Sequence, residues 1–204
     1  RAGRTLNSAT TSSRPAPPLR VCIVQPVLPH YRVPVFDALG RRPGIALSVW
    51  AGGAVGSLGS VSADATSFAT RPARMHFLGP AVVQPAQLRA AVSSAFDVVV
   101  FSWTSRNPEL LPAIRLARRR GKRALVFGIG RSMAETPWRG RLRNRIGFSA
   151  DGCILYGERD AERLVAAGLP PHKAYVAHNA LDQAPIGAAR LHWEGRPEEL
   201  AAFR

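Results

Sequence analysis

The chain has 204 residues, of which 46% are hydrophobic and 20% are charged, a size that suits one domain with a buried core. Its two cysteines and the absence of a run of roughly 20 apolar residues exclude a disulfide-stapled secreted domain, a zinc finger and a membrane-spanning helix. The formal net charge of +15, nearly all from Arg, favours an anionic partner without choosing among phospholipid, phosphorylated substrate and nucleic acid.

Residues 1–19 are mostly Ser, Thr, Ala, Pro and Arg, with almost no large apolar side chain. Such a segment cannot bury enough surface to offset the entropy of ordering, so we predict a disordered tail. Several Arg and no acidic residue also fit an organellar transit peptide, whereas a secretory signal would need an apolar core.

From residue 20 onward, short apolar runs alternate with helical stretches. The runs are continuous rather than alternating, which is typical of strands in a sheet covered on both faces. The predicted strands are 21–24, 45–50, 74–78, 97–101, 123–127, 152–155 and 173–177, the predicted helices are 33–41, 85–95, 108–120, 138–148 and 158–167, and 51–71 is a long loop. Strands alternating with helices predict an α/β fold with a doubly wound, mostly parallel, Rossmann-like sheet.

In such a sheet, ligands bind beyond the carboxyl ends of the strands. The loop after the first strand lacks both the dinucleotide fingerprint and the P-loop. Instead, His30, Tyr31 and Arg32 open a helix there, where backbone amides favour anions. We expect Arg32 to contact a phosphate or carboxylate and His30 a sugar hydroxyl. The alternative is that His30 caps the helix and Tyr31 only packs.

Two further loops supply candidate ligand contacts at the same edge. After the strand at 123–127 come Gly128, Gly130, Arg131 and Ser132, where glycines allow close approach by a ligand; an ordinary tight turn explains them nearly as well. After the strand at 97–101, Trp103 is a candidate platform for a sugar ring, or a packing residue.

The stretch HYRVPVFDAL after the first strand, followed by ADGCILYGERDAERLVAAGLPPHKAYVAHNALD at 150–182, resembles the family-4 glycosyltransferases of the GT-B fold. The resemblance covers residues 20–204. It implies transfer of a sugar from a nucleotide sugar to a hydroxyl acceptor with retention, and no bound metal. It also implies that His178 and Asn179 face an interdomain cleft; the alternative is that they are only turn residues after the last strand.

The sequence departs from that family at two points. Gly-Ile-Gly at 128–130 replaces the frequent Gly-His-Gly, so a His contact to the donor sugar or the acceptor is missing. The paired glutamates of the family's nucleotide-sugar site belong to a second domain, so no catalytic residue is assigned here. We therefore expect a fragment or a split protein: a tail at 1–19, an acceptor-binding domain at 20–182, and a linker at 183–204 leading to a C-terminal donor-binding domain. The chain itself is expected to bind no cofactor, the nucleotide sugar being a co-substrate of the full-length enzyme.

The segment 138–148 combines four Arg with an apolar stripe and no acidic residue, the pattern of a helix lying on a membrane surface. The expected contacts with an anionic, cytoplasmic-side membrane are Trp138, Arg139, Arg141, Leu142, Arg143, Arg145 and Ile146. The alternative is that the stripe packs on the sheet and the Arg side chains are solvated.

Three functions remain open from the sequence. The first is the acceptor-binding half of a cytoplasmic glycosyltransferase that acts on a sugar or lipid-linked acceptor. The second is a basic Rossmann-like module for RNA or another anionic polymer, although aromatic residues at 7% and the lack of an RNA-binding motif disfavour nucleic acid. The third is a non-catalytic scaffold derived from a transferase.

Overall fold

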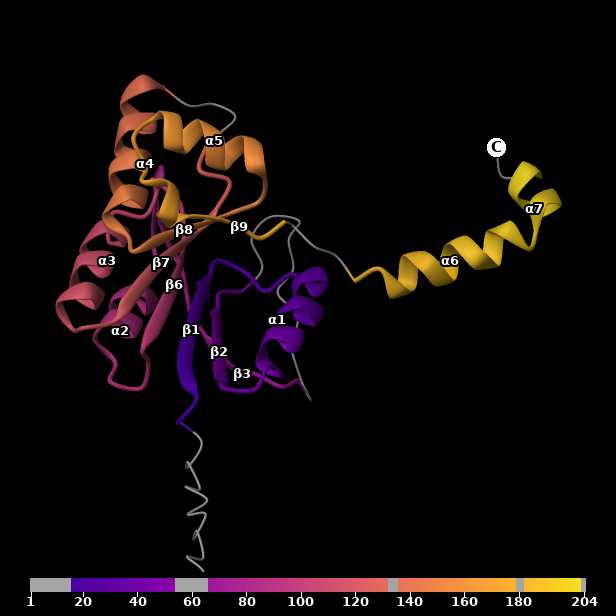
Figure 1. Cartoon of the computed structure of the whole chain (residues 1–204), viewed down its shortest axis with the longest axis horizontal. Coiled ribbons are helices and arrows are strands. Elements are labelled where there is room, and N and C mark those ends of the chain that lie inside the picture. Colours follow the sequence, from indigo (N-terminus) through magenta and orange to yellow (C-terminus); the bar gives the residue numbers. More distant parts are fainter. Residues whose placement is uncertain (1–15, 54–65, 132–135, 179–181, 203–204) are drawn as a thin grey trace, which may run out of the picture.

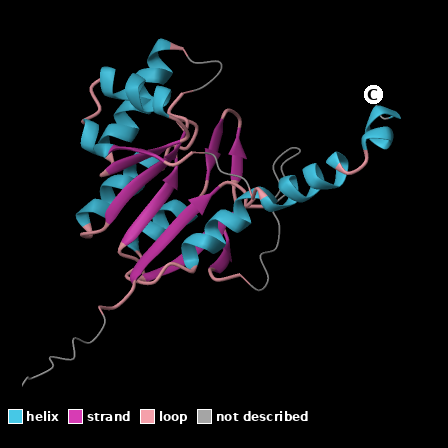
Figure 2. Cartoon of the chain, turned by 45° about the vertical axis from the view of Figure 1, so that its right-hand side comes forward, coloured by secondary structure: helices cyan, strands magenta, loops and turns pink. Residues whose placement is uncertain are grey.

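The computed structural model describes residues 16–53, 66–131, 136–178 and 182–202. Its centre is a seven-stranded sheet with the order β3-β2-β1-β6-β7-β8-β9, in which every neighbouring pair is parallel (Figures 1 and 2). The predicted doubly wound, Rossmann-like α/β fold is confirmed. The strands of this sheet are β1 (Leu19–Gln25), β2 (Ile45–Ala51), β3 (Ala69–Pro72), β6 (Val98–Ser102), β7 (Arg123–Gly128), β8 (Gly152–Leu155) and β9 (Ala174–Val176).

The helices follow the strands much as the apolar periodicity predicts. They are η1 (His30–Arg32), α1 (Val33–Gly40), α2 (Ala86–Val92), α3 (Leu110–Arg119), α4 (Pro137–Ser149), α5 (Glu158–Ala166), η2 (Pro171–Lys173), α6 (Ala184–Glu194) and α7 (Pro197–Ala202). The last two belong to the predicted linker and extend away from the sheet in Figures 1 and 2, with no buried residue.

The strand assignments differ from the prediction in one region. The predicted strand at 74–78 does not join the sheet; β4 (His76–Leu78) instead pairs antiparallel with β5 (Ala81–Val83). One of the sheet's two edge strands is β3, part of which the sequence assigned to a loop. All four residues of β3 are exposed, so its sequence carries no apolar run that would predict a strand.

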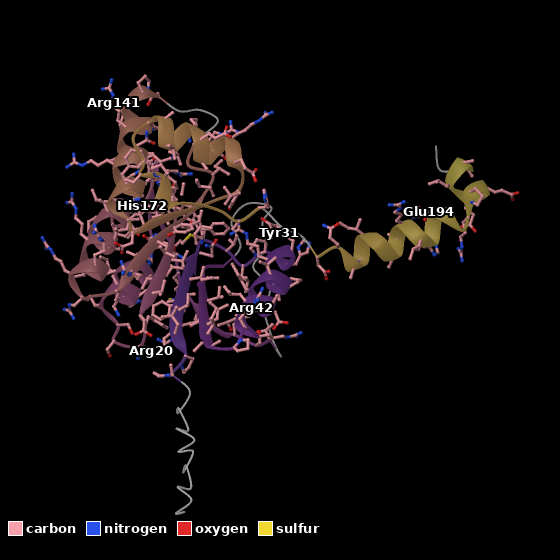
Figure 3. The ribbon with its side chains drawn as sticks, viewed as in Figure 1. Arg20, Tyr31, Arg42, Arg141, His172 and Glu194 are labelled. Atoms are coloured by element: carbon pink, nitrogen blue, oxygen red, sulfur yellow. The ribbon has the colours of Figure 1, made fainter. Side chains whose placement is uncertain are left out.

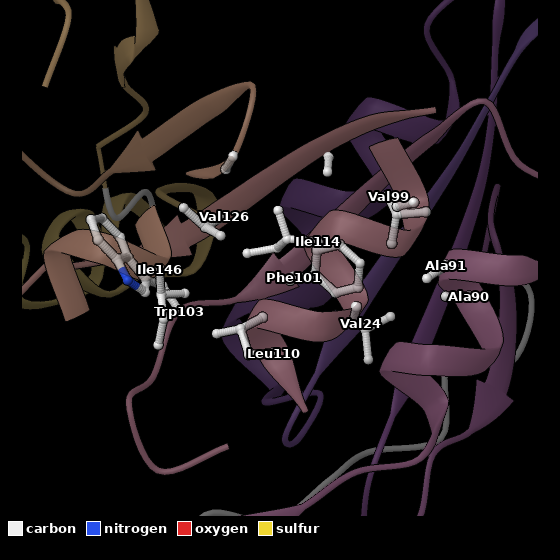
Figure 4. Close-up of a cluster of buried hydrophobic side chains, with 14 of the residues drawn as sticks. Val24, Ala90, Ala91, Val99, Phe101, Trp103, Leu110, Ile114, Val126 and Ile146 are labelled. Carbon is white, nitrogen blue, oxygen red and sulfur yellow. The ribbon is translucent and has the colours of Figure 1, made fainter. Parts of the chain in front are cut away.

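One face of the sheet carries the larger core. Phe101 and Val126 from the sheet pack with Leu110 and Ile114 of α3, in a cluster that also includes residues of α2, α4 and α5 (Figure 4). These four side chains are fully buried. Burial of this much apolar surface is the main stabilising contribution to the fold.

The opposite face is covered unevenly. Phe36 of α1 packs with Ile23 and Val49 over β1 and β2. Farther along the sheet, Phe127 and Ile154 on β7 and β8 are only partly buried. Phe127 therefore keeps part of its surface exposed near the carboxyl edge of the sheet, where the candidate site lies.

Candidate functional site

The side chain of Arg32 is held at the carboxyl edge of the sheet by residues from three strands or their adjoining loops. Its Nη1 donates to Oε1 of Gln25 at 2.9 Å, and its Nη2 donates to the hydroxyl of Tyr156. Its guanidinium lies 4.8 Å from the centre of the Phe127 ring and 5.6 Å from that of Tyr156. The ring centre of Tyr31 lies 6.0 Å away, so two hydrogen bonds and three aromatic rings fix the orientation of the cation.

The charge of Arg32 is not neutralised within the described part of the chain. Its hydrogen-bond partners there, an amide oxygen and a phenol, are both neutral, and none of the described carboxylates forms an ion pair with it. A guanidinium has five N–H donors in a planar fork that matches carboxylate and phosphate groups. The half-buried Arg32 therefore remains a potential donor to an anionic or hydroxyl group.

Gln25 supplies a second unused donor beside Arg32. The residue is only 4% exposed, and its Nε2 has no hydrogen-bond partner in the described structure. Its backbone oxygen accepts a 2.9 Å bond from Nε2 of the buried Gln84, which also donates to the Ala73 carbonyl at 3.2 Å. The Gln84 side chain thus ties the end of β1 to the segment after β3, which rigidifies this edge.

The two residues before Arg32 are accessible. His30 is exposed and meets the half-buried Tyr31 edge-on, with ring centres 5.8 Å apart. Figure 3 shows Tyr31 at this edge, away from Arg20 and Arg42 at the other end of the sheet. The alternative that His30 caps a helix is not supported, because the N-cap residues of η1 and α1 are Pro29 and Arg32.

The glycines after β7 are explained by the protein's own packing. Gly130 has φ = +64°, a conformation that favours glycine, and a Cβ there would lie 2.9 Å from Leu164 Cδ1. Its carbonyl accepts a 2.7 Å bond from Arg163. A Cβ at Gly128 would lie 3.2 Å from the Cβ of Trp103. The expected close approach by a ligand is replaced by helix and indole contacts, which favours the alternative of a tight turn.

Arg131 and Trp103 are also engaged with their own fold. Arg131 Nε lies 3.3 Å from Asp160 Oδ1 of α5. Trp103 is 7% exposed, and its indole N–H donates to the Arg143 carbonyl at 3.2 Å. Its ring packs so closely on Gly147 of α4 that a Cβ at this glycine would overlap it. The expectation that Trp103 is a platform for a sugar ring is therefore wrong, because its ring is buried against α4. Ser132 lies outside the described residues.

His178 lies after β9 at the same edge. Its Nε2 is 3.2 Å from Glu158 Oε1 in the first turn of α5, and both side chains are mostly exposed. The interdomain role predicted for His178 is not tested by this contact. Asn179 lies outside the described residues.

The helix predicted at 138–148 exists as α4, but Leu142 and Ile146 of its apolar stripe face inward, and only Trp138 is exposed. Ile146 is 3% exposed, and Leu142 packs against the larger core. Arg143 is 7% exposed and Nη2 donates to Ser105 Oγ at 3.3 Å. The membrane-surface expectation is therefore wrong for these three residues, because they are packed within the protein. The members of the set that are exposed are Trp138, Arg139, Arg141 and Arg145. No helix among the described residues is long and apolar enough to cross a bilayer.

Sequence reasoning missed the partners of Arg32, namely Gln25, Phe127 and Tyr156. Each lies at or just after the end of a strand of one parallel sheet, which is the signal that would have found them. It also missed a hollow of about 340 Å³ at the end of β3, lined by Pro72, Arg74, His76, Pro85 and Arg89. No apolar run marks β3, so nothing in the sequence pointed to this hollow.

Metal and thiol chemistry find no support in the described residues. No group of three or more His, Cys, Asp or Glu side chains is placed there to hold a metal ion. Burial raises the pKa of both cysteines, Cys22 and Cys153, to about 12, so neither thiol is an activated nucleophile.

The fold is that of known sugar-nucleotide enzymes. The chain matches a solved UDP-N-acetylglucosamine 2-epimerase with a TM-score of 0.53 and 13% identity, over 78% of this chain and 48% of that one. The UDP-N-acetylglucosamine 2-epimerase from Rickettsia bellii matches with a TM-score of 0.45, 14% identity, and coverage of 78% and 44%. The UDP-GlcNAc 2-epimerase from Methanocaldococcus jannaschii gives 0.49, 13%, and coverage of 78% and 45%.

No protein-family model matches the chain, and neither does any curated protein. At 13% identity, the likeness to the first epimerase shows the fold alone. The chain spans about half the length of these enzymes. Its Rossmann-like sheet corresponds to one half of the GT-B arrangement, which these epimerases share with glycosyltransferases.

Proposed function

We propose that this chain is the acceptor-binding half of a retaining glycosyltransferase, which moves a sugar from a nucleotide sugar to a hydroxyl of a sugar or lipid-linked acceptor. The observation that carries the proposal is the Arg32 cation, oriented by Gln25 and Tyr156 and left without a carboxylate partner among the described residues. It lies at the carboxyl edge of a parallel sheet, where proteins of this fold class bind ligands.

Arg32 and Gln25 have complementary roles in this proposal. The guanidinium attracts an anionic group of the acceptor, and Oε1 of Gln25 accepts a 2.9 Å hydrogen bond that holds the guanidinium in place. His30 and Tyr31, on the accessible side of Arg32, contact the rest of the acceptor.

Donor binding is assigned to a second domain. Catalysis requires both reactants to be held together in one cleft, and this chain spans about half the length of the GT-B-like enzymes that it matches. We therefore expect the isolated chain to transfer no sugar and to bind uridine and guanosine diphosphate sugars weakly. Micromolar binding of such a nucleotide sugar to this chain would contradict the assignment.

The test is calorimetric titration of the chain with neutral sugars, sugar monophosphates and nucleotide sugars. Arg32→Gln should weaken the binding of sugar monophosphates at least 10-fold, because it removes the cation and both anchoring bonds. Arg42→Gln is the matched control, since Arg42 is an exposed cation at the far end of α1 (Figure 3) and should leave the affinity unchanged. Equal affinities of the native and Arg32→Gln chains, with intact circular dichroism, would refute the proposal.

A second candidate function is suggested by the likeness to UDP-N-acetylglucosamine 2-epimerase. In that case the chain would be half of an enzyme that acts on a nucleotide sugar and needs no acceptor. The same titration separates the two functions. Preference for a nucleotide sugar over all acceptor sugars, lost in Arg32→Gln, would favour the epimerase-like function.

A further inference from the structure

A basic hollow lies at the amino edge of the sheet, opposite the candidate site. It has a volume of about 570 Å³ and is lined by Arg115, Arg118, Arg119, Gly121, Lys122, Arg123 and Asp151. Five cationic side chains therefore face one carboxylate. Arg123 begins β7 and Gly128 ends it, so at roughly 3.3 Å per residue the two edges are about 17 Å apart.

The local sequence forces these cations together. Gly121 has φ = +73°, the left-handed conformation that ends α3 and reverses the chain within two residues. The amide of Lys122 donates to the Ala117 carbonyl at 3.1 Å, which closes the turn. As a result, Arg123 at the start of β7 lies beside the last turns of α3, where Arg115 and Arg119 are one helical turn apart.

Two of the five cations are engaged by the protein. Arg118 Nε lies 3.0 Å from Asp151 Oδ1, and its Nη1 donates to the Ser149 carbonyl at 2.9 Å. Lys122 is 8% exposed, and its Nζ donates to the backbone oxygens of Ser93 and Phe96. These bonds explain why both residues are present and make them walls of the hollow.

The other three, Arg115, Arg119 and Arg123, are exposed and have no ion pair or side-chain hydrogen bond with any described residue. A cation in the last turn of a helix is stabilised by the helix dipole, which accounts for Arg119. It does not account for Arg115, one turn earlier, or for Arg123 on the strand. Their mutual repulsion is relieved by a ligand that carries several negative charges.

The lining also defines the chemistry of that ligand. It contains no aromatic or large apolar side chain, so it offers no stacking surface for a base and no apolar contact for an acyl chain. Arg guanidinium groups bind phosphate oxygens through pairs of parallel hydrogen bonds. The volume falls in the range of about 300–1,000 Å³ that is usual for small-molecule sites.

We propose that this basic hollow is a binding site for a small ligand with two or more phosphate groups, separate from the sugar site around Arg32. Arg115, Arg119 and Arg123 bind the phosphate oxygens, while Arg118 and Lys122 hold the walls in place. The site does not depend on the proposed glycosyltransferase function, because no residue of the sugar site contributes to it.

The test is calorimetric titration of the chain at about 0.15 M salt, with inorganic tripolyphosphate and, separately, inorganic phosphate. Tripolyphosphate is expected to bind at one site at least 10-fold more tightly than phosphate. The variant R115Q/R119Q/R123Q should weaken tripolyphosphate binding at least 10-fold. The matched control is R139Q/R141Q/R145Q, which removes an equal number of positive charges from the exposed surface of α4, outside the hollow. It should change the affinity for tripolyphosphate less than 2-fold.

Equal weakening in the two triple variants would overturn the proposal, because it would show attraction by net charge alone. If the hollow variant loses its native circular dichroism spectrum, the single variant R119Q should still weaken binding at least 3-fold, and an unchanged affinity would refute the site. A parallel arm uses phosphatidylglycerol vesicles. Sedimentation with these vesicles that requires the three hollow arginines, without tripolyphosphate binding, would assign the surface to a membrane and overturn the small-ligand site.

Discussion

Replacing Trp103 by Phe is expected to destabilise the fold by about 2–3 kcal/mol and to leave the sugar site intact. The indole is 7% exposed, packs against Gly147 and Ile146 in the larger core, and donates to the Arg143 carbonyl at 3.2 Å. Trp103 therefore fastens α4 to the sheet.

Two losses make up this magnitude. Phe cannot donate the hydrogen bond, and the net contribution of such a bond is about 1 kcal/mol. The smaller ring also leaves unfilled space in a core where complete truncation of a Trp or Phe costs about 3–5 kcal/mol, so partial truncation is expected to cost about 1–2 kcal/mol. In a chain of this length, the sum lowers Tm by about 4–12 °C.

The assay is urea denaturation followed by circular dichroism, which does not depend on the substituted fluorophore. Trp138→Phe is the matched control, because Trp138 is 60% exposed. The centre of its ring lies 5.3 Å from the guanidinium carbon of Arg139. This control should change the free energy of unfolding by no more than about 0.5 kcal/mol. A Trp103→Phe chain as stable as the native one, but with weakened sugar binding, would refute the packing role and restore Trp103 as a sugar platform.

Three further predictions concern packing, pH and thiol reactivity. Gly147→Ala should destabilise the fold by about 1–3 kcal/mol, because the new Cβ overlaps a buried ring, whereas Gly187→Ala, whose Cβ would meet nothing within 4 Å, should not lower Tm. The hydrogen bonds from Arg20 lower the pKa of Asp97 to about 2, so this carboxylate stabilises the fold above its unfolded pKa near 4, and its contribution is lost as the pH falls from about 4 to about 2. The urea midpoint of the native chain should therefore fall more steeply over that interval than the midpoint of Arg20→Gln, and parallel curves would contradict the assignment. The two buried cysteines should resist Ellman's reagent at pH 8 until the chain is unfolded in urea, and rapid labelling of the native chain would show that their burial is wrong.

The sequence by itself determined the architecture and the position of the candidate site. Continuous apolar runs such as 97–101 and 123–127 can be buried only in a sheet covered on both faces, and the helices between them require parallel crossovers. That topology places the carboxyl ends of the strands at one edge. Arg32 lies in the segment that follows the first strand, so its place in the chain predicts that it lies at this edge.

Only the tertiary structure decided what these side chains contact. Trp103, Gly130 and Arg131 were sound candidates as loop residues at a ligand-binding edge, yet α4 and α5 pack over that part of the edge and engage all three. The same packing turned Leu142 and Ile146 of the apolar stripe of α4 inward. A helical period shows that a helix has an apolar face but not whether that face meets a membrane or a sheet.

The partners of Arg32 and the basic hollow depended on tertiary structure for the same reason. Gln25, Phe127 and Tyr156 are separated by up to 131 positions and meet only because β1, β7 and β8 lie in one sheet. Similarly, the helix predicted at 108–120 ends in an Arg run at 118–120, where the helix dipole favours cations whether or not they line a site. The turn at Gly121 and the parallel entry of β7 place part of that run around a hollow with Arg115 and Arg123. Local patterns fix the elements, whereas contacts between distant elements fix which charges are left without a partner.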